Sequence, residues 1–282
     1  MAHSPRRSAA AIRRAFSGEH RQAAAQAVPR GCADLGFDSY APCQQRLRAL
    51  LALGIFNSGP LQQWPGTWGM GSLTHYDVTF SPRHDDLVLI TPTPSNVLQY
   101  LVPRGKLGGV PGLRLQEARA DAFVLRHLVT GARMTITDRP PVPAFDGGFE
   151  EHRRVWTVHH GLTSHEQEAL ADVPPMTEDA LALLSGLVAR IGLCDSDQRW
   201  ALGNWFADPL DRTLAWNRRG RRLWGHGDWW ELTWSSFPFH DDVAMALTDP
   251  RAGVAGAQAV QGRRGWDVRL GSGVLALRTD ED

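Results

Sequence analysis

Alternation of apolar and polar residues predicts short strands along much of the chain. In the segment from Trp229 to Trp234, the side chains of Trp230, Leu232 and Trp234 fall on one side of an extended backbone and Glu231 and Thr233 on the other. Further runs bounded by Gly, Pro or Asp residues predict strands over 113–116, 122–129, 133–137, 266–270 and 274–279. All of these runs are too short for long helices.

Helical spacing marks a smaller number of segments. Leu47, Leu50, Leu51 and Gly54 recur at three- and four-residue intervals, and Leu184, Leu187, Val188 and Ile191 do so in the second half. Thr177 is placed to cap the second of these helices, and Ser164 with Gln167 forms a capping-box pattern. Shorter helices are expected over residues 1–30, 95–101 and 251–260.

The two halves of the chain resemble each other. The segments Trp68–Pro94 and Trp224–Pro250 align without a gap at an offset of 156 residues, with eight identities in 27 positions that include WGxG and PxHDD. Upstream, ALLALGIFNS (49–58) matches LVARIGLCDS (187–196) at an offset of 138. The difference between the offsets predicts an insertion in the second half, within residues 197–223.

A proline- and glycine-rich stretch, residues 139–150, separates the halves and reads as a linker. We therefore predict a basic helical segment (1–30), a first unit (31–138) and a second unit (151–282). Because long helices between parallel strands are missing from the pattern, the predicted fold is α+β with antiparallel sheet. Each unit is expected to follow the order helix–ββ–α–ββ, and the two units to pack as a pseudo-dimer.

Composition adds charge asymmetry to this picture. The 282 residues carry 30 basic and 30 acidic side chains, but residues 1–30 hold six Arg against Glu19, a net charge of +5, and the remainder is −5. This start is interpreted either as an arm that touches nucleic acid or an acidic partner, or as a solvated helix. With one Lys beside 29 Arg, the chain has the codon bias of a GC-rich bacterial genome. The chain has three Cys and no CxxC motif, which favours a location in the reducing cytoplasm. No apolar run approaches the roughly 20 residues that a membrane span needs.

The repeated HDD triplet is one candidate for chemistry. It is expected at a hairpin turn in each half, where Asp is a good turn residue. Alternatively, pseudo-twofold packing brings His84, Asp86, His240 and Asp242 together as ligands of a divalent metal ion or as an acid–base site. The turn interpretation is favoured because no established metal-ligand spacing is present.

The insertion provides a second candidate. Arg218, Arg219, Arg221 and Arg222 lie between Trp216 and Trp224, with Asn217 and Gly220 suited to a hairpin loop. Arginines contact phosphates and aromatic rings stack on bases, so this hairpin is the best nucleic-acid candidate in the sequence. An arginine-rich turn over a tryptophan core is the competing structural interpretation.

These patterns favour a cytoplasmic binding or regulatory protein without catalysis or cofactor. A composite surface of the two units would recognise nucleic acid or a protein partner, mainly through the Arg/Trp hairpin, and a homodimer is possible. The alternative is a divalent-metal-dependent hydrolase or nucleotidyl-transfer-like enzyme that uses the HDD triplets. A third hypothesis is a small-molecule or glycan binder with a tryptophan-lined cleft.

Overall fold

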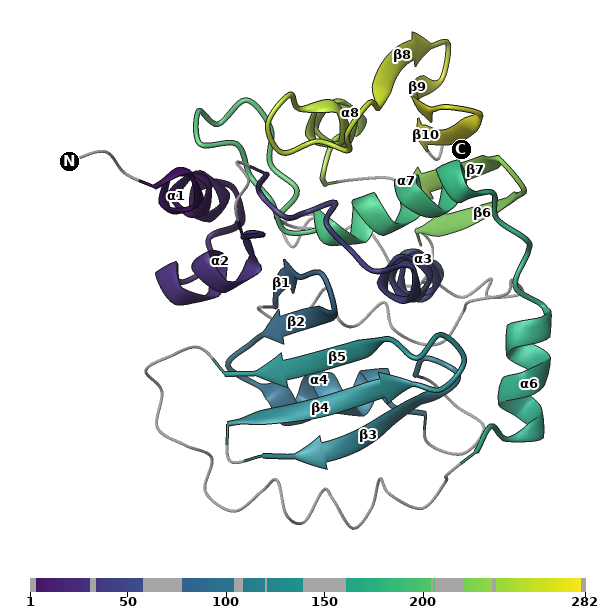
Figure 1. Ribbon diagram of the computed structural model, residues 1–282. Helices are drawn as coiled ribbons and strands as arrows, with labels where there is room; N and C mark the ends of the chain where they lie inside the picture. Colours follow the sequence, from purple (N-terminus) through teal and green to yellow (C-terminus); the bar gives the residue numbers. More distant parts are fainter. Residues whose placement is uncertain are drawn as a thin grey trace, which may run out of the picture.

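The computed structural model describes residues 4–30, 34–57, 78–103, 109–119, 121–138, 161–203, 205, 221–234 and 237–279. Within these residues the chain forms seven helices and two five-stranded sheets, a mixed α+β fold (Figure 1). The predicted linker over 139–150 lies outside the described residues.

The first sheet follows three helices, α1 (Pro5–Ser17), α2 (Arg21–Ala27) and α3 (Pro42–Phe56). Its strands and the helix α4 are β1 (Thr79–Pro82), β2 (Asp86–Ile90), α4 (Pro94–Leu101), β3 (Leu113–Ala118), β4 (Ala122–His127) and β5 (Arg133–Thr137). The strand order is β1-β2-β5-β4-β3, and α4 packs against β4 and β5.

The second sheet follows α6 (Ser164–Ala171) and α7 (Glu178–Ala189). Its strands are β6 (Arg222–His226), β7 (Trp229–Trp234), β8 (Gln258–Gly262), β9 (Gly265–Leu270) and β10 (Gly273–Thr279), and helix α8 (His240–Thr248) lies between β7 and β8 along the chain. The order β6-β7-β10-β9-β8 repeats the order of the first sheet, and α8 packs mainly on β9. As the alternation predicts, Trp230, Leu232 and Trp234 are all buried.

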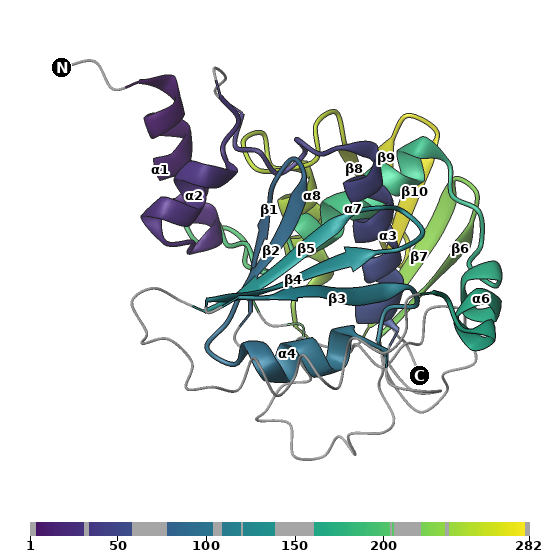
Figure 2. The same cartoon turned by 60° about the horizontal axis from the view of Figure 1, so that its bottom comes forward.

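Helices α3 and α7 pack on each other and lie between the two sheets, as both views show (Figures 1 and 2). One continuous cluster of buried apolar residues includes side chains of both sheets and both helices. Asn57, just after α3, also bonds across the halves, because its side-chain amide donates to the Leu223 carbonyl (2.9 Å) and accepts from the Leu223 N–H (3.0 Å). The halves therefore share a core.

The prediction of purely antiparallel sheets is wrong at one pair in each sheet. Strand β2 runs parallel to β5, and β7 runs parallel to β10. In each half the hairpins that follow the intervening helix return the last strand beside the second one in the same direction. Alternation indicates which residues are extended but not which strands become neighbours.

The predicted repeat register of 156 residues is also wrong. The first two strands of each sheet begin 143 residues apart, since β1 begins at Thr79 and β6 at Arg222, and β2 begins at Asp86 and β7 at Trp229. The HDD triplet forms the β1–β2 turn and the start of β2 in the first half, but it opens helix α8 in the second. Aspartate suits both a turn and the positive end of a helix, so the triplet by itself does not select one structure.

Local helix signals are mostly confirmed. The Thr177 side chain caps α7 by accepting from the Ala180 N–H (3.3 Å). The capping box of α6 is formed one residue earlier than predicted, by Thr163 and Glu166. The helix expected over 251–260 is wrong, because the second-half helix is α8 and Gln258–Gly262 is strand β8. None of the described helices has the length and apolar character needed to cross a membrane.

Candidate functional site: a basic groove between the first two helices

Helices α1 and α2 form a hairpin whose geometry is set by local signals. The Ser4 hydroxyl accepts from the Arg7 N–H at the start of α1, and Gly18 ends the helix in the left-handed conformation (φ 66°). His20 then caps α2, with its Nδ1 accepting from the Gln22 N–H (3.4 Å). The chain therefore reverses within three residues and brings α2 against α1.

A buried ion pair fixes this hairpin to the rest of the molecule. Arg13 donates from Nε to Glu19 Oε2 (2.9 Å) and from Nη2 to Glu19 Oε1 (2.7 Å), and both side chains are fully buried. The same guanidinium donates to the carbonyls of Leu35 (2.7 Å) and Pro82 (3.1 Å). Arg13 is thus fully engaged inside the fold, and its charge is balanced there.

The C-terminal end of α1 also contacts the second half. The ring of Phe16 stacks on Trp200 with centroids 5.8 Å apart, and the Phe16 carbonyl accepts from the Cys194 N–H (2.9 Å). The guanidinium of Arg251 lies 5.3 Å from the Phe16 ring centroid. The basic leading segment is therefore a docked part of the fold and not a free arm.

A groove of about 720 Å³ lies between α1 and α2. Its lining residues are basic, small or uncharged, and include no acid. They are Ser4, Arg6, Arg7, Ser8, Ala10, Ala11, Arg14, Arg21, Gln22, Ala25 and Gln26. With four arginines and no carboxylate, the groove has a local charge of +4. Such a surface attracts anions and repels cations.

Three of the four arginines are available to a ligand. Arg7, Arg14 and Arg21 are exposed, and their guanidiniums make no hydrogen bond or ion pair within the described residues. Arg6 is partly buried and donates from Nη2 to the Ala25 carbonyl (2.7 Å), while its buried Nε has no partner there. Arg6 therefore holds the two helices together, and the other three project their charge into the solvent.

A second cavity of about 560 Å³ adjoins the groove, since Arg14 and Arg21 line both. Its other lining residues come from the α1–α2 turn and from the first sheet, and they are Gly18, Glu19, His20, Thr79 and Ile90. The two cavities thus extend from the helix hairpin towards β1. Guanidiniums bind carboxylate and phosphate oxygens through paired N–H donors, which gives this surface a defined chemistry.

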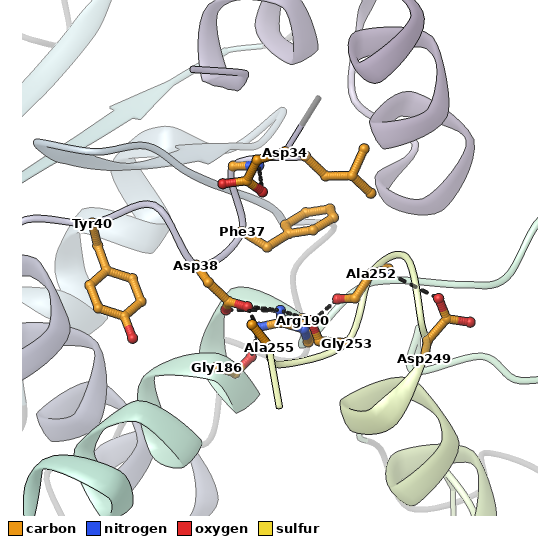
Figure 3. A network of polar contacts seen from close by, with 12 residues as sticks. Asp34, Phe37, Asp38, Tyr40, Gly186, Arg190, Asp249, Ala252, Gly253 and Ala255 are labelled. Carbon is orange, nitrogen blue, oxygen red and sulfur yellow. Dashed lines mark hydrogen bonds and ion pairs between the residues drawn. The ribbon is translucent and has the colours of Figure 1, made fainter. Parts of the chain in front are cut away.

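The other buried arginines have a structural role. Arg190, the residue that follows α7, donates to the carbonyls of Ala252 (2.6 Å), Gly253 (2.7 Å) and Gly186 (3.1 Å) and to Asp38 Oδ2 (2.9 Å), as Figure 3 shows. This network joins the loop before α3 to α7 and to the segment after α8. Because its donors all point at protein acceptors, it is a staple between the halves and not a ligand site.

Arg48 lies in the same region of the core and donates to the Arg83 carbonyl (2.7 Å). Burial lowers the pKa of the Arg48 guanidinium to about 10, so it remains charged at neutral pH. It contributes, like Arg190, to holding the loop that contains Phe37 and Tyr40.

In the first half, the HDD triplet is divided between solvent and core. The His84 and Asp85 side chains are exposed at the β1–β2 turn. Asp86 is buried, accepts from the Thr135 hydroxyl (2.8 Å) and lies 3.1 Å from Arg133 Nε. Burial raises the Asp86 pKa, and these two partners oppose that rise. Asp86 is therefore already engaged within the sheet.

In the second half, the triplet is part of a helix start. The His240 ring stacks on Trp234 with centroids 3.9 Å apart, and burial lowers the pKa of His240. Asp241 accepts from the Trp266 indole (2.6 Å), while burial raises the pKa of Asp242. The two triplets have different neighbours and different secondary structure. No group of three or more His, Cys, Asp or Glu side chains in the described parts of the chain is arranged to hold a metal ion.

The Arg/Trp candidate is described only at its C-terminal end, since Trp216, Arg218 and Arg219 lie outside the described residues. Arg221 donates to the Trp205 carbonyl, and burial lowers its pKa to about 10. Arg222 and Trp224 belong to strand β6, while the loop and first arm of the predicted hairpin lie outside the described residues. The Arg222 guanidinium lies 5.5 Å from the Trp224 ring, which meets Trp229 edge-on at 5.2 Å.

The described end of the Arg/Trp candidate lies far from the groove. Helices α1 and α2 lie at one end of the molecule, and β6 and β7 lie at the other, in both views (Figures 1 and 2). Sequence reasoning identified the charge of residues 1–30 but not the groove. The signal was present in α1, where Arg7 and Arg14 are two helical turns apart with Ala10 and Ala11 between them.

Comparison of the chain with protein-family models, with curated proteins and with solved structures gives no match.

Proposed function

We propose that this chain is a non-catalytic binding protein that recognises nucleic acid through the groove between α1 and α2. The observation that carries the proposal is the +4 charge of the groove lining, with no acid and with three exposed, unpaired arginines. Phosphate contacts supply most of the affinity of non-specific nucleic-acid binding. Arg7 and Arg14 are about 10 Å apart along the helix axis, a span that covers roughly three phosphates of one duplex strand.

Rigidity supports this assignment over a solvated helix. The Arg13–Glu19 pair and the Arg6–Ala25 bond hold α1 and α2 in place, so the backbone that carries the exposed arginines loses little freedom when a ligand binds. Small side chains on the groove floor, Ala10, Ala11 and Ala25, leave room for a sugar–phosphate backbone.

We further propose that the two halves arose by duplication of one unit and that the second unit adds a separate contact. The shared strand order and the parallel pair in each sheet support the duplication. The exposed Arg222 beside Trp224 and Trp229 offers a cation and aromatic faces, the combination on which unpaired bases stack. Because it lies at the other end of the molecule, only a long ligand reaches both regions.

The test is binding of a fluorescent 20-nucleotide single strand to the full chain, followed by fluorescence anisotropy at 50 to 200 mM salt. Arg7→Ala with Arg14→Ala should weaken binding roughly tenfold at 50 mM salt and reduce the slope of log K against log salt by about 1.4. With a duplex probe, the same double variant should reduce the slope of log K against log salt by about 1.8.

The matched control is Arg263→Ala with Arg264→Ala, which removes the same charge from the β8–β9 turn. This variant should bind as the wild type does. Equal losses in both double variants would mean that net charge and not the groove drives binding, and unchanged affinity in the groove variant would refute the proposal. Binding of poly-glutamate in preference to both nucleic acids would assign the groove to an acidic protein instead.

A further inference from the structure

Three of the four sheet edges are closed by other parts of the chain. The amide of Asn57 occupies the edge of β6 by pairing with both backbone groups of Leu223, and the turn after β6 bonds to the segment before α7 through Gly227 and Thr177 (3.0 Å). Strand β1 is covered by α1, α2 and α7. Both edges are therefore contacted by other elements within the described residues.

The edge of the first sheet at β3 is blocked in a different way. Its ladder is interrupted by a bulge between Leu115 and Glu117. The Arg114 guanidinium leaves this strand to form a two-pronged pair with Glu166 of α6 (2.6 and 2.7 Å). Bulges and charged side chains are common means of preventing edge-to-edge pairing.

Strand β8 has no bulge, and no side chain bonds to its backbone within the described residues, although helix α8, which packs mainly on β9, also contacts it. It pairs only with β9 within the described residues and lies at the outer rim of the second sheet (Figure 1). Four of its five residues are exposed, with Val260 at 45% of its maximum, and the sequence Gln-Ala-Val-Gln-Gly contains no charge and no proline. A regular, uncharged and exposed edge strand is a template for another strand.

The register shows which backbone groups are free. Strands β8 and β9 are joined by the two-residue turn Arg263–Arg264, which Gly262 and Gly265 close. In an antiparallel ladder, alternate residues point their N–H and C=O groups towards the partner strand. Counting from the closing pair, Gly262, Val260 and Gln258 face β9, so the N–H and C=O groups of Ala259 and Gln261 face outward.

Two arginines mark one end of this edge. Arg263 and Arg264 are exposed, and neither side chain makes a hydrogen bond or ion pair within the described part of the chain. The neighbouring acid, Asp267, is already engaged by Arg278 and by Arg269 (3.2 Å). A positive charge without an internal partner therefore lies where an added strand would end.

We propose that the β8 edge is a docking site for an extended peptide segment of a partner protein, which adds to the second sheet as a sixth strand. Its backbone bonds to Ala259 and Gln261, and an acidic side chain at one end pairs with Arg263 and Arg264. This mode takes affinity from main-chain hydrogen bonds and selectivity from the side chains at its ends.

The dimensions favour a peptide over a second copy of the chain. A five-residue strand spans about 17 Å, and pairing along it buries far less than the roughly 1,600 Å² of a stable protein–protein interface. Two copies would also have no acid to place against Arg263 and Arg264 from β8 itself. A peptide with an acidic end matches both the short edge and its charge.

The experiment selects ligands from a displayed library of random dodecapeptides on the immobilised full chain. Recovered peptides should carry Asp or Glu near one end. They should bind Gln261→Pro about tenfold more weakly than wild type, because proline removes an outward N–H and leaves the β8–β9 ladder intact. Gln261→Ala keeps that N–H and should bind within twofold of wild type. Arg263→Gln with Arg264→Gln should weaken binding at low salt.

Hydrogen exchange on the wild-type chain provides a readout that does not depend on the folding of a variant. A recovered peptide should slow exchange at the Ala259 and Gln261 amides and leave the groove between α1 and α2 unchanged. The proposal is overturned if no peptide is enriched, if recovered peptides bind Gln261→Pro as tightly as wild type, or if these amides are not protected. A wild-type dimer that Gln261→Pro dissociates in sedimentation would assign the edge to a second copy.

Discussion

Replacing Arg190 by Met tests whether the staple between the halves stabilises the fold. Methionine keeps an unbranched apolar stem in the buried position but removes every donor. The guanidinium now joins the Asp38 carboxylate to the carbonyls of Ala252, Gly253 and Gly186, with distances of 2.6 to 3.1 Å (Figure 3). All of these acceptors lose a charged donor in the variant.

The expected loss follows from the burial of the pair. Removing one member of a buried ion pair costs about 3–5 kcal/mol, because the other charge stays without its partner. The Asp38 side chain is 24% exposed, so water replaces part of what the guanidinium provided. The Ala255 N–H also continues to donate to Asp38 (3.1 Å). We therefore expect a loss near the lower limit, about 3 kcal/mol, or roughly 150-fold in the unfolding equilibrium constant.

Equilibrium unfolding in urea, followed by tryptophan fluorescence and by circular dichroism, measures this loss. Asp38→Asn should cost less than Arg190→Met, since the arginine keeps its three carbonyl acceptors. The double variant should cost less than the sum of the two single variants. Arg264→Met is the matched surface control and should change stability by less than about 0.5 kcal/mol. A loss below about 1 kcal/mol in Arg190→Met, with both probes coincident, would refute the reasoning.

Two further predictions concern other contacts between elements. Asn57→Ala leaves the buried N–H and C=O of Leu223 without partners and should destabilise the chain by about 2–4 kcal/mol in the same urea assay, whereas a loss below 1 kcal/mol would show that water replaces the amide. Burial alone raises the pKa of Glu166, but hydrogen bonds from Arg114 and from the Thr163 and Gly112 amides outweigh it and lower the pKa to about 2. Since the usual value is near 4.5, the stabilisation is complete above about pH 4.5 and is lost as the pH falls towards 2. Glu166→Gln should therefore flatten the pH dependence of the urea midpoint over this range, and identical profiles for both proteins would contradict the assignment.

Local patterns predicted most elements close to their observed bounds. The strands expected over 133–137 and 274–279 are β5 (Arg133–Thr137) and β10 (Gly273–Thr279), and the helix expected over 95–101 is α4 (Pro94–Leu101). Turn residues and alternation act over a few positions, so they can be read without the rest of the fold. The alignment of the two halves was predicted incorrectly, because a short identity such as HDD is compatible with more than one local structure.

The candidate site shows the same division. The excess of arginine in residues 1–30 can be seen in the sequence. Whether each arginine can contact a ligand depends on whether its side chain points into the core or towards the solvent. Arg13 points into the core and meets Glu19, whereas Arg7, Arg14 and Arg21 point outward. Helical spacing shows which residues of α1 share a face, but it does not show which face is buried. The tertiary structure shows this, because Ala9 and Phe16 are buried.

The sequence by itself determined the α+β composition of the chain and the positions of most strands and caps. It did so because side-chain alternation, capping and turn chemistry are local. Only the tertiary structure decided that β2 and β5, and likewise β7 and β10, pair in parallel, that α3 and α7 join the halves through a shared core, and that the basic segment forms a groove. These outcomes depend on contacts between residues far apart along the chain. Such contacts stabilise the fold only after the distant segments have come together, so local sequence patterns do not reveal them.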